Sequence, residues 1–447
     1  MTQLVQPGIL PGFMELLPEE QVLFNSIMDT IRRHFERYGF WPLDTPMIEK
    51  SEILFAKGGG ETTKQIYRIV KGEHSQDQAL RFDLTVPLAR YVAQHASEIS
   101  FPFRRYQIAK VFRGERNQKG RYREFYQADI DIIGRDSLSL LNDAEIPAVI
   151  YGIFQEIGVG SPILHINHRG LLNGFFHAIG LRDSEEALRS LDKLAKIGET
   201  GVKELLLHSG ASDEQIRQIF DFLAPTNSNS ETFALLENLE EGLALSEEAG
   251  NLYKKGLAEL HTVFDSMLQF GIPETAIQVD RSITRGLDYY TGMVYETFLE
   301  GYESIGSVCS GGRYDNLAEN FTKEHLPGVG LSIGLTRLFY QLHSTGLITP
   351  HHGDYIDAII IPMGEEDLDF AIQTVRMLRE QNLRVQIYTE KGKMKKKFAY
   401  ADSIGAGSVI TIGESERKQG KISLKNLETG VQEILSVEEA VKRLQRH

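Results

Sequence analysis

Eight basic residues are concentrated in one short stretch of an otherwise acidic chain. The chain has 447 residues and a formal net charge of −14 at pH 7, yet the segment from Arg104 to Arg123 contains a single acidic residue, Glu115. A local excess of cations in an acidic protein indicates an anionic ligand. The alternative is a surface hairpin whose arginines are solvated.

This stretch has the pattern of a β-hairpin. Strands are expected at Gln107–Arg113 and Arg121–Ile133, joined by a polar loop with Asn117 and Gly120. Because side chains alternate between the two faces of a strand, one face of the second strand has a cationic end, an aromatic middle and an end of amide and carboxylate groups. Such a face could hold a phosphate, a flat base and an amine in sequence. Its residues are Arg121, Arg123, Phe125, Gln127, Asp129 and Asp131.

Further segments place polar groups next to strand or helix ends. Leu80–Pro87 is expected to pass from a strand into a helix, with Thr85 as the N-cap and Asp83 as a candidate ligand for an amine. Gly328–Leu338 is expected to pass from a strand of small residues into a helix with Arg337 near its start, where an anion is favoured. Two clusters rich in glycine, arginine and tyrosine, each of which could also be only a tight turn, are Arg285–Gly292 and Ser310–Asp315.

Longer patterns show which elements must position these groups. Helical periodicity predicts a helix from Pro18 to about Tyr38, followed by an extended Phe40–Pro46 that serves as scaffold or as a subunit interface. From about residue 170 to 270, amphipathic helical patterns replace strands, which indicates a helical insertion. After a linker at 344–355, alternating strands and helices predict a compact α/β domain at 356–447.

The expected strands of this last domain are Ala358–Pro362, Arg384–Tyr388 and Ser408–Ile412. Its expected helices are Glu366–Gln381, Met394–Ile404 and Val437–Leu444. A basic run near the start of the second of these helices is either a solvated helix end or a contact with an RNA backbone. Its residues are Lys391, Lys393, Lys395, Lys396 and Lys397.

Composition excludes several classes of protein. A hydrophobic content of 41% and a charged content of 25% are ordinary for a globular protein. The single cysteine, Cys309, excludes an internal disulfide and a cysteine-based metal cluster, and the scattered histidines do not indicate a metal site. The N-terminal residues do not have the pattern of a signal peptide, and no run approaches the length of a membrane span. The simplest compartment is the cytosol.

Five of these segments together resemble a known family. The hairpin resembles motif 2 of class II aminoacyl-tRNA synthetases, Pro18–Pro46 resembles motif 1, and Gly330–Arg337 resembles motif 3. Arg285–Gly292 (RGLDYYTG) and Ser310–Leu317 (SGGRYDNL) resemble the two histidine-binding motifs of the histidyl-tRNA synthetase family. The resemblance covers nearly the whole chain. It implies a fold of mixed α/β class: a catalytic α+β domain on an antiparallel sheet at 1–343 that contains the helical insertion, and an α/β anticodon-binding domain at 356–447.

The resemblance also implies a two-step reaction. The carboxylate of histidine attacks the α-phosphorus of ATP to give histidyl-adenylate and pyrophosphate, and the histidyl group then passes to its tRNA. In this scheme Arg113 holds the α-phosphate, Arg121 and Arg337 hold the β- and γ-phosphates, and Phe125 stacks on adenine. Glu115 is also assigned to the ATP site. Arg285 matches the catalytic arginine, whose permanent forked charge suits a developing anion. Magnesium is implied through the ATP phosphates.

The remaining roles are also taken from the resemblance. Histidine would be held at its amino end by Asp83, Thr85 and Gln127, and at its imidazole end by Asp131, Tyr289, Tyr290 and Tyr314. Arg285 would also line the histidine site. The expected tRNA contacts are Arg116, Asn117 and Gln118 at the hairpin tip, and Lys395, Lys396 and Lys397 in the C-terminal domain. A homodimer is implied because motif 1 is the dimer element of the family.

The sequence departs from the family pattern at a few positions. Thr336 stands where an acidic residue commonly precedes the motif 3 arginine, so the support of Arg337 is expected to differ. Asp83 and Asp131 stand where many bacterial relatives have glutamate. Three alternatives remain: a non-catalytic regulatory subunit of histidine biosynthesis, a class II synthetase for another amino acid, and an RNA-binding module. The first typically lacks the anticodon domain and an intact ATP motif, both of which are present in this sequence.

Overall fold

The computed structural model describes residues 4–445, except 57–61, 72–73, 116–119, 243–246, 285–289, 352 and 354. Contacts between residues divide the chain into two compact units. The first unit comprises Met1–Met14 and Ile27–Leu347, and the second comprises Glu15–Ser26 and Ile348–His447.

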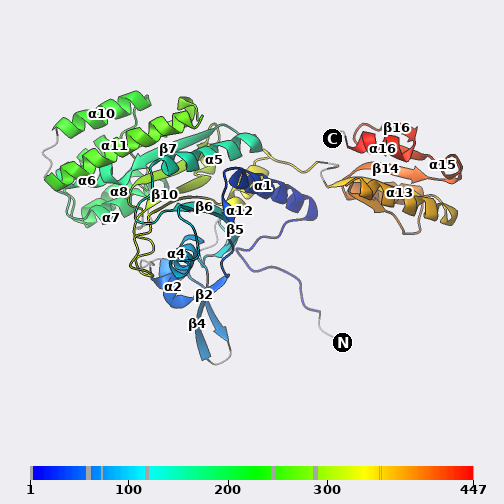
Figure 1. Ribbon diagram of the computed structural model, residues 1–447, viewed down its shortest axis with the longest axis horizontal. Coiled ribbons are helices and arrows are strands. Elements are labelled where there is room, and N and C mark those ends of the chain that lie inside the picture. The colour runs from blue at the N-terminus through cyan, green and yellow to red at the C-terminus, as the bar shows by residue number, and fades with distance from the viewer. Residues whose placement is uncertain are drawn as a thin grey trace. The chain divides into compact units, whose positions relative to one another are not determined.

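A largely antiparallel sheet forms the centre of the first unit (Figure 1). Within the described residues it has eight strands in the order β1-β5-β6-β11-β10-β9-β7-β8. Only the two outermost pairs, β1 with β5 and β7 with β8, are parallel. The strands are β1 (Trp41–Pro42), β5 (Phe103–Phe112), β6 (Glu124–Ile133), β7 (Pro162–His168), β8 (Ile277–Val279), β9 (Met293–Leu299), β10 (Cys309–Tyr314) and β11 (Gly328–Ile333).

The predicted hairpin is confirmed as β5 and β6, which pair along their full length from Phe103–Ile133 to Phe112–Glu124. The outer half of β6 is only partly covered, whereas its inner half, from Ala128 to Ile133, is buried. β11 lies on the other side of β6, in a register that pairs Ser332 with Asp129 and Gly330 with Asp131. The polar face of the hairpin therefore continues onto β11.

Helices support this sheet at both ends of the hairpin. The predicted first helix is confirmed as α1 (Pro18–Arg37), where Ile31 and Phe35 are fully buried and the Phe35 ring lies 5.6 Å from that of Tyr106 on β5. Contacts with β6 fix α12 (Leu335–Ser344), in which the hydroxyl of Thr336 accepts a hydrogen bond from the backbone N–H of Tyr126. Other helices of this part are α2 (Ser51–Phe55), α3 (Thr62–Gln65), α4 (Thr85–Gln94) and α5 (Leu141–Ile157).

Helices follow one another without strands between residues 169 and 269 of the described chain. α11 packs against α5, α6 and β7, and Figure 1 shows α6, α10 and α11 side by side in green. Apolar residues at helical spacing explain this packing, since Leu171, Leu172 and Phe176 on α6 are fully buried. The helices are α6 (Arg169–Ala178), α7 (Ser184–Leu191), α8 (Leu194–His208), α9 (Asp213–Leu223), α10 (Asn229–Gly242) and α11 (Glu247–Gln269).

The C-terminal unit contains a mixed sheet in the order β13-β12-β14-β15-β16. β12 is parallel to both of its neighbours, and β15 and β16 add antiparallel strands at one side. Its strands are β12 (Ile356–Pro362), β13 (Val385–Ile387), β14 (Ala406–Ile412), β15 (Ile422–Asn426) and β16 (Gln432–Leu435). Its helices are α13 (Leu368–Glu380), α14 (Met394–Ser403), α15 (Glu414–Gln419) and α16 (Val437–Leu444).

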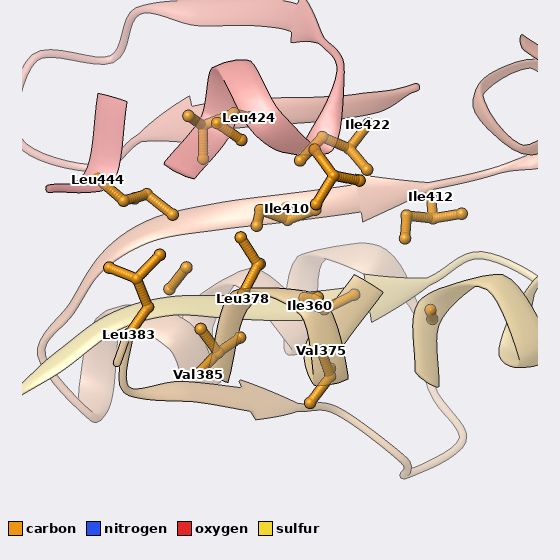
Figure 2. Close-up of a cluster of buried hydrophobic side chains, with 14 residues drawn as sticks. Ile360, Val375, Leu378, Leu383, Val385, Ile410, Ile412, Ile422, Leu424 and Leu444 are labelled. Carbon is orange, nitrogen blue, oxygen red and sulfur yellow. The ribbon is translucent and has the colours of Figure 1, made fainter. Parts of the chain in front are cut away.

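The continuous apolar run of β12 reflects burial on both faces, as expected of a central parallel strand. Ala358 and Ile360 belong to one hydrophobic cluster, and Ile359 and Ile361 belong to another. Figure 2 shows the first cluster, in which Ile360 and Ile410 of the sheet lie close to Leu378 of α13. This core forms within the unit itself.

The structure differs from the sequence-based expectations in three places. Thr85 is not the N-cap of α4: the helix begins at Thr85 after Leu84, and the carboxylate of Asp83 accepts a hydrogen bond from the Val86 N–H at 3.0 Å. A three-stranded sheet formed by β2 (Ile48–Lys50), β3 (Arg68–Lys71) and β4 (His74–Leu80) was not predicted, because these strands are short and polar. The β15–β16 hairpin was also missed.

Candidate active site

One cavity of about 490 Å³ in the first unit brings the predicted site residues together. Its floor is the outward face of β6 and β11, and its rim is formed by residues from α12, β10 and the start of α4. Predictions for Arg285, Tyr289, Arg116, Asn117 and Gln118 lie outside the described residues. The predicted residues that line the cavity are Asp83, Thr85, Arg113, Glu115, Arg121, Phe125, Gln127, Asp131, Tyr290, Tyr314 and Arg337.

Arginines and an aromatic ring form one end of the cavity. The guanidinium of Arg113 lies 4.5 Å from the ring centre of Phe82 and 5.1 Å from that of Phe125, and its Nε donates to the Phe82 carbonyl at 3.2 Å. These contacts hold the arginine in place beside the Phe125 ring. The Arg113 guanidinium and the Phe125 ring therefore line the same part of the cavity.

Arg121 and Arg337 complete the cationic end. Arg337, in the first turn of α12, donates from Nη2 to the carbonyl of Ile305 at 3.2 Å, and Arg121 lies 3.7 Å from the carboxylate of Glu115. Burial lowers the pKa of Arg337, and the positive charge of Arg121 lowers it further. Two cations that repel each other across a cavity favour a polyanion between them.

Buried carboxylates form the other end. Asp131 makes an ion pair with Arg105 at 2.6 Å and accepts a hydrogen bond from the Tyr314 hydroxyl at 2.7 Å. Burial raises the pKa of Asp131, although the charge of Arg105 and the hydrogen bond from Tyr314 oppose that shift. Burial likewise raises the pKa of Asp83. Further donors from a ligand would stabilise the ionised form of either carboxylate.

A chain of hydrogen bonds lies between the two ends. Gln127 donates from Nε2 to the Ser332 hydroxyl at 2.7 Å, and that hydroxyl lies 2.5 Å from the carboxylate of Asp129. Burial raises the pKa of Asp129 to about 7, with opposing effects from its charged neighbours. Both Asp129 and Ser332 line the cavity.

Glycines on β11 make room for the acidic end. A Cβ atom at position 330 would lie 2.0 Å from the Oδ1 atom of Asp131, and one at position 328 would lie 2.3 Å from the Tyr314 ring. Both distances are far below van der Waals contact. The absence of side chains at Gly328 and Gly330 therefore allows Asp131 and Tyr314 to meet.

Sequence reasoning missed Ser332 and Arg105 as site residues. It placed Asp129 on the same face of the second strand as Gln127 and Asp131 but gave it no role, and the structure shows that Asp129 lines the cavity. Arg105 is fully buried directly opposite Asp131 in the hairpin register, but it lies outside the predicted first strand, Gln107–Arg113. Ser332 had no comparable sequence signal, because its partner Asp129 lies 203 residues earlier in the chain.

The predicted basic run lies in the second unit, at the start of α14. Lys395 and Lys396 are exposed. Lys397 is different: its side chain is buried, and its ammonium group donates to the carbonyl of Pro362 at 3.1 Å. The geometry of Lys397 is that of a structural residue, since it lies on the inward face of α14 and reaches the last residue of β12.

The fold and its cavity define a class II aminoacyl-tRNA synthetase. The family model for histidyl-tRNA synthetase matches residues 12–338, and the model for an anticodon-binding domain matches residues 357–447. The chain belongs to the histidyl-tRNA synthetase family.

Individual relatives agree with this assignment over the full length of the chain. A curated protein from Clostridium tetani named histidine–tRNA ligase is 53% identical, covering 98% of each chain. One of the same name from Finegoldia magna is 48% identical, covering 99% of this chain and 100% of that protein. The crystal structure of histidyl-tRNA synthetase from Nostoc sp. PCC 7120 superimposes with a TM-score of 0.89 at 37% identity, covering 99% of each chain.

Proposed function

We propose that the protein attaches histidine to its tRNA in two steps at this cavity, with ATP as the energy-supplying substrate. In the first step an oxygen of the histidine carboxylate forms a bond to the α-phosphorus of ATP, and the bond to pyrophosphate breaks. In the second step a ribose hydroxyl of the tRNA attacks the carbonyl carbon of histidyl-adenylate, and AMP leaves. The observation that carries the proposal is a single cavity with a cationic aromatic end and a buried acidic end.

The cationic end suits the triphosphate. The first step brings two anions together, so its transition state needs fixed positive charge. We assign the α-phosphate to Arg113 and the β- and γ-phosphates to Arg121 and Arg337, while Phe125 stacks on adenine. The repulsion between Arg121 and Arg337 supports this assignment, because a bound phosphate would relieve it. Glu115, beside Arg121, is assigned to ATP, and Arg285 is assigned the catalytic role by its family motif.

The acidic end suits histidine. We assign its ammonium group to Asp83, Thr85 and Gln127, and its imidazole ring to Asp131, Tyr290 and Tyr314, with Tyr289 and Arg285 added by the family motif. Asp131 has one oxygen on Arg105 and one on Tyr314, which leaves lone pairs for an imidazole N–H. An amino acid that lacks this imidazole N–H would leave the buried carboxylate of Asp131 less well compensated, and this difference provides selectivity for histidine.

Magnesium is proposed to enter with ATP, on the phosphates. Among the described residues there is no group of three or more His, Cys, Asp or Glu side chains that could hold a metal ion. Carboxylates near the phosphate end, Glu115 and Glu296, act on the pKa of Arg337, so acidic groups are present there. We propose that the ATP phosphates are the main ligands of this ion.

Further aspects of the proposal concern assembly and tRNA. We propose a homodimer through α1 and β1, because β1 lies at an edge of the sheet and Trp41 is 72% exposed.

The proposed domain bounds are 1–343 for the catalytic domain, with an insertion at about 170–270, a linker at 344–355, and 356–447 for the anticodon-binding domain. Arg116 and Gln118, with Lys395 and Lys396, are proposed to contact tRNA, whereas the buried position of Lys397 does not support such a contact.

The proposed location is the cytoplasm. Within the part of the chain that the structure describes, no helix has the length and apolar character needed to cross a membrane.

Amino-acid-dependent exchange of pyrophosphate into ATP tests this function. We expect exchange with histidine and none with the other amino acids. A protein that binds histidine but gives no exchange would instead be the non-catalytic regulatory subunit. That alternative is less well supported, because the full-length relatives are named as ligases and the cationic residues of the site are present.

A further inference from the structure

We infer that Asp129 and Ser332 are positioning residues that fix the side-chain amide of Gln127 so that its carbonyl oxygen faces the ammonium group of histidine. This inference rests on the proposed function, and it adds two residues to the machinery that selects the amino acid.

The direction of the hydrogen bonds follows from the chemistry of the three groups. An ionised carboxylate only accepts hydrogen bonds, so while Asp129 is ionised its bond with Ser332, 2.5 Å long, takes the single hydroxyl proton of the serine. The serine oxygen can then only accept from its other neighbour. At 2.7 Å, that neighbour is the amide of Gln127, which must therefore present its NH₂ group to Ser332.

The other end of this amide is consequently oriented as well. With Nε2 bound to Ser332, the carbonyl Oε1 of Gln127 points away from the serine. Oε1 is buried and has no hydrogen-bond partner among the described residues. A buried acceptor without a partner costs free energy, and a ligand N–H at this place would recover it. Gln127 lines the cavity, so the cavity is where such a ligand would lie.

Charge at this end of the cavity favours a cationic ligand group. Three buried or half-buried carboxylates, Asp83, Asp129 and Asp131, line the cavity here. Arg105 and Arg113 act on these carboxylates, and Arg81, which is itself paired with Asp44 at 3.6 Å, also acts on Asp129. With the Arg81–Asp44 pair counted as neutral, the formal charges leave one negative charge in excess, which the ammonium group of an amino acid would neutralise. An ammonium group also supplies the N–H that Gln127 Oε1 lacks.

The register of the sheet explains why these residues act together. Ser332 on β11 stands directly opposite Asp129 on β6, and Gln127 lies two residues away from Asp129 on the same face. Both strands lie at the centre of the sheet, so Gln127, Asp129 and Ser332 are held by rigid elements. Rigidly held amides lose less entropy when they bind a ligand.

The first test replaces the serine hydroxyl. In Ser332→Ala the amide of Gln127 loses its anchor, and we expect the KM for histidine in pyrophosphate exchange to rise by about tenfold. The KM for ATP is expected to stay within about twofold, since the phosphate contacts remain. Ser332→Thr keeps the hydroxyl and is expected to restore most of the histidine affinity. Ser266→Ala is the matched control, because the Ser266 hydroxyl donates to the carbonyl of Thr262 within α11.

A second test separates positioning from packing by direct calorimetric binding of two histidine analogues. Histidinol keeps the amine and lacks the carboxylate, whereas imidazole propionate keeps the carboxylate and lacks the amine. We expect Ser332→Ala to weaken histidinol by about tenfold and to leave imidazole propionate unchanged, because only the former contacts Gln127 Oε1. Equal weakening of both analogues, or of neither, would overturn the inference. Absence of exchange in the wild-type protein would instead refute the proposed function, since analogue binding is measured without catalysis.

Discussion

Gly330 is the residue whose replacement bears most directly on the acidic end of the cavity. In Gly330→Ala the new methyl group would lie 2.0 Å from Asp131 Oδ1, so Asp131 must move. Arg105 and Tyr314 hold that carboxylate, and its movement would misplace the imidazole partner. We expect the KM for histidine to rise by at least about tenfold, measured by pyrophosphate exchange, with little change in the KM for ATP.

Gly334→Ala provides a comparison within the same segment. Its added Cβ would meet only the Cβ of Arg337, at 3.9 Å, which is ordinary contact. The effect on the KM for histidine should therefore be clearly smaller than that of Gly330→Ala. If the two substitutions raised that KM equally, steric pressure on Asp131 would not be the cause.

The raised pKa of Asp129 leads us to expect that histidine binding depends on pH. Burial raises the pKa of Asp129 to about 7; Asp131 and Asp83 act in the same direction, while Arg105 and the Ser332 hydroxyl act against it. Because the pKa is raised, Asp129 is ionised above about pH 7 and gains a proton below it. A protonated Asp129 can donate to Ser332, which then donates to Gln127 and turns the amide around.

The expected result is weaker histidine binding as the pH falls through about 7. The measurement is the ratio of histidine KM values between Ser332→Ala and the wild-type protein from pH 6 to pH 8. The ratio removes the titration of the imidazole of histidine itself, which is common to both proteins. We expect the ratio to fall toward one at low pH, and a ratio independent of pH would contradict the role of Asp129.

Much of the cavity could be predicted at the residue scale because strand alternation is local. Phe125, Gln127 and Asp131 are separated by two, four or six residues on β6, so a single strand places them on one face. By contrast, Gly330 and Ser332 act through partners on another strand. Their function depends on the register between β6 and β11, which no local pattern determines.

At the scale of elements, a buried ion pair connects α5 to β10. Arg313 contacts Asp143 through Nε at 3.0 Å and through Nη2 at 2.5 Å, and both side chains are buried. In Asp143→Ala the buried guanidinium would lose its main counter-charge and keep only the more distant contact with Asp315, at 3.8 Å. We expect the free energy of unfolding of the first unit to fall by about 3–5 kcal/mol, measured by urea denaturation.

A surface pair provides the control for this loss. Arg189 and Glu186 on α7 are 43% and 38% exposed, and their separation is 3.4 Å. Glu186→Ala should lower the free energy of unfolding by less than about 1 kcal/mol. Similar losses in both variants would show that the α5–β10 pair is not a special support of the sheet.

Prediction of elements succeeded where the hydrophobic period was long and failed where strands were short and polar. α16 has the predicted bounds, Val437–Leu444, and α1 ends within one residue of its expected end. β4 has the sequence HSQDQAL and gains its structure from pairing with β2 and β3 rather than from its own pattern. Pairing between distant segments is the information that propensity and periodicity do not contain.

At the scale of the whole molecule, the acidic net charge and the local basic groups have different roles. A formal charge of −14 repels nucleic acid in general, so tRNA must be bound by local cations. Such cations occur at the cavity in the first unit and at α14 in the second, which has a hydrophobic core of its own. Adenylation and tRNA binding can therefore be changed separately.

Charge reversal on α14 tests this separation. In Lys395→Glu/Lys396→Glu, two exposed cations become anions that repel the RNA backbone, and we expect kcat/KM for tRNA charging to fall by about tenfold at moderate salt. Pyrophosphate exchange should be unchanged, because no residue of α14 lines the cavity. Lys421→Glu/Lys442→Glu gives the same change in net charge elsewhere in the unit and should affect charging less. Lys397→Met, at the buried position, should instead destabilise the unit, since the carbonyl of Pro362 would lose its donor. Equal loss of exchange and charging in the Lys395/Lys396 variant would indicate a folding defect and would remove these lysines from the tRNA contact.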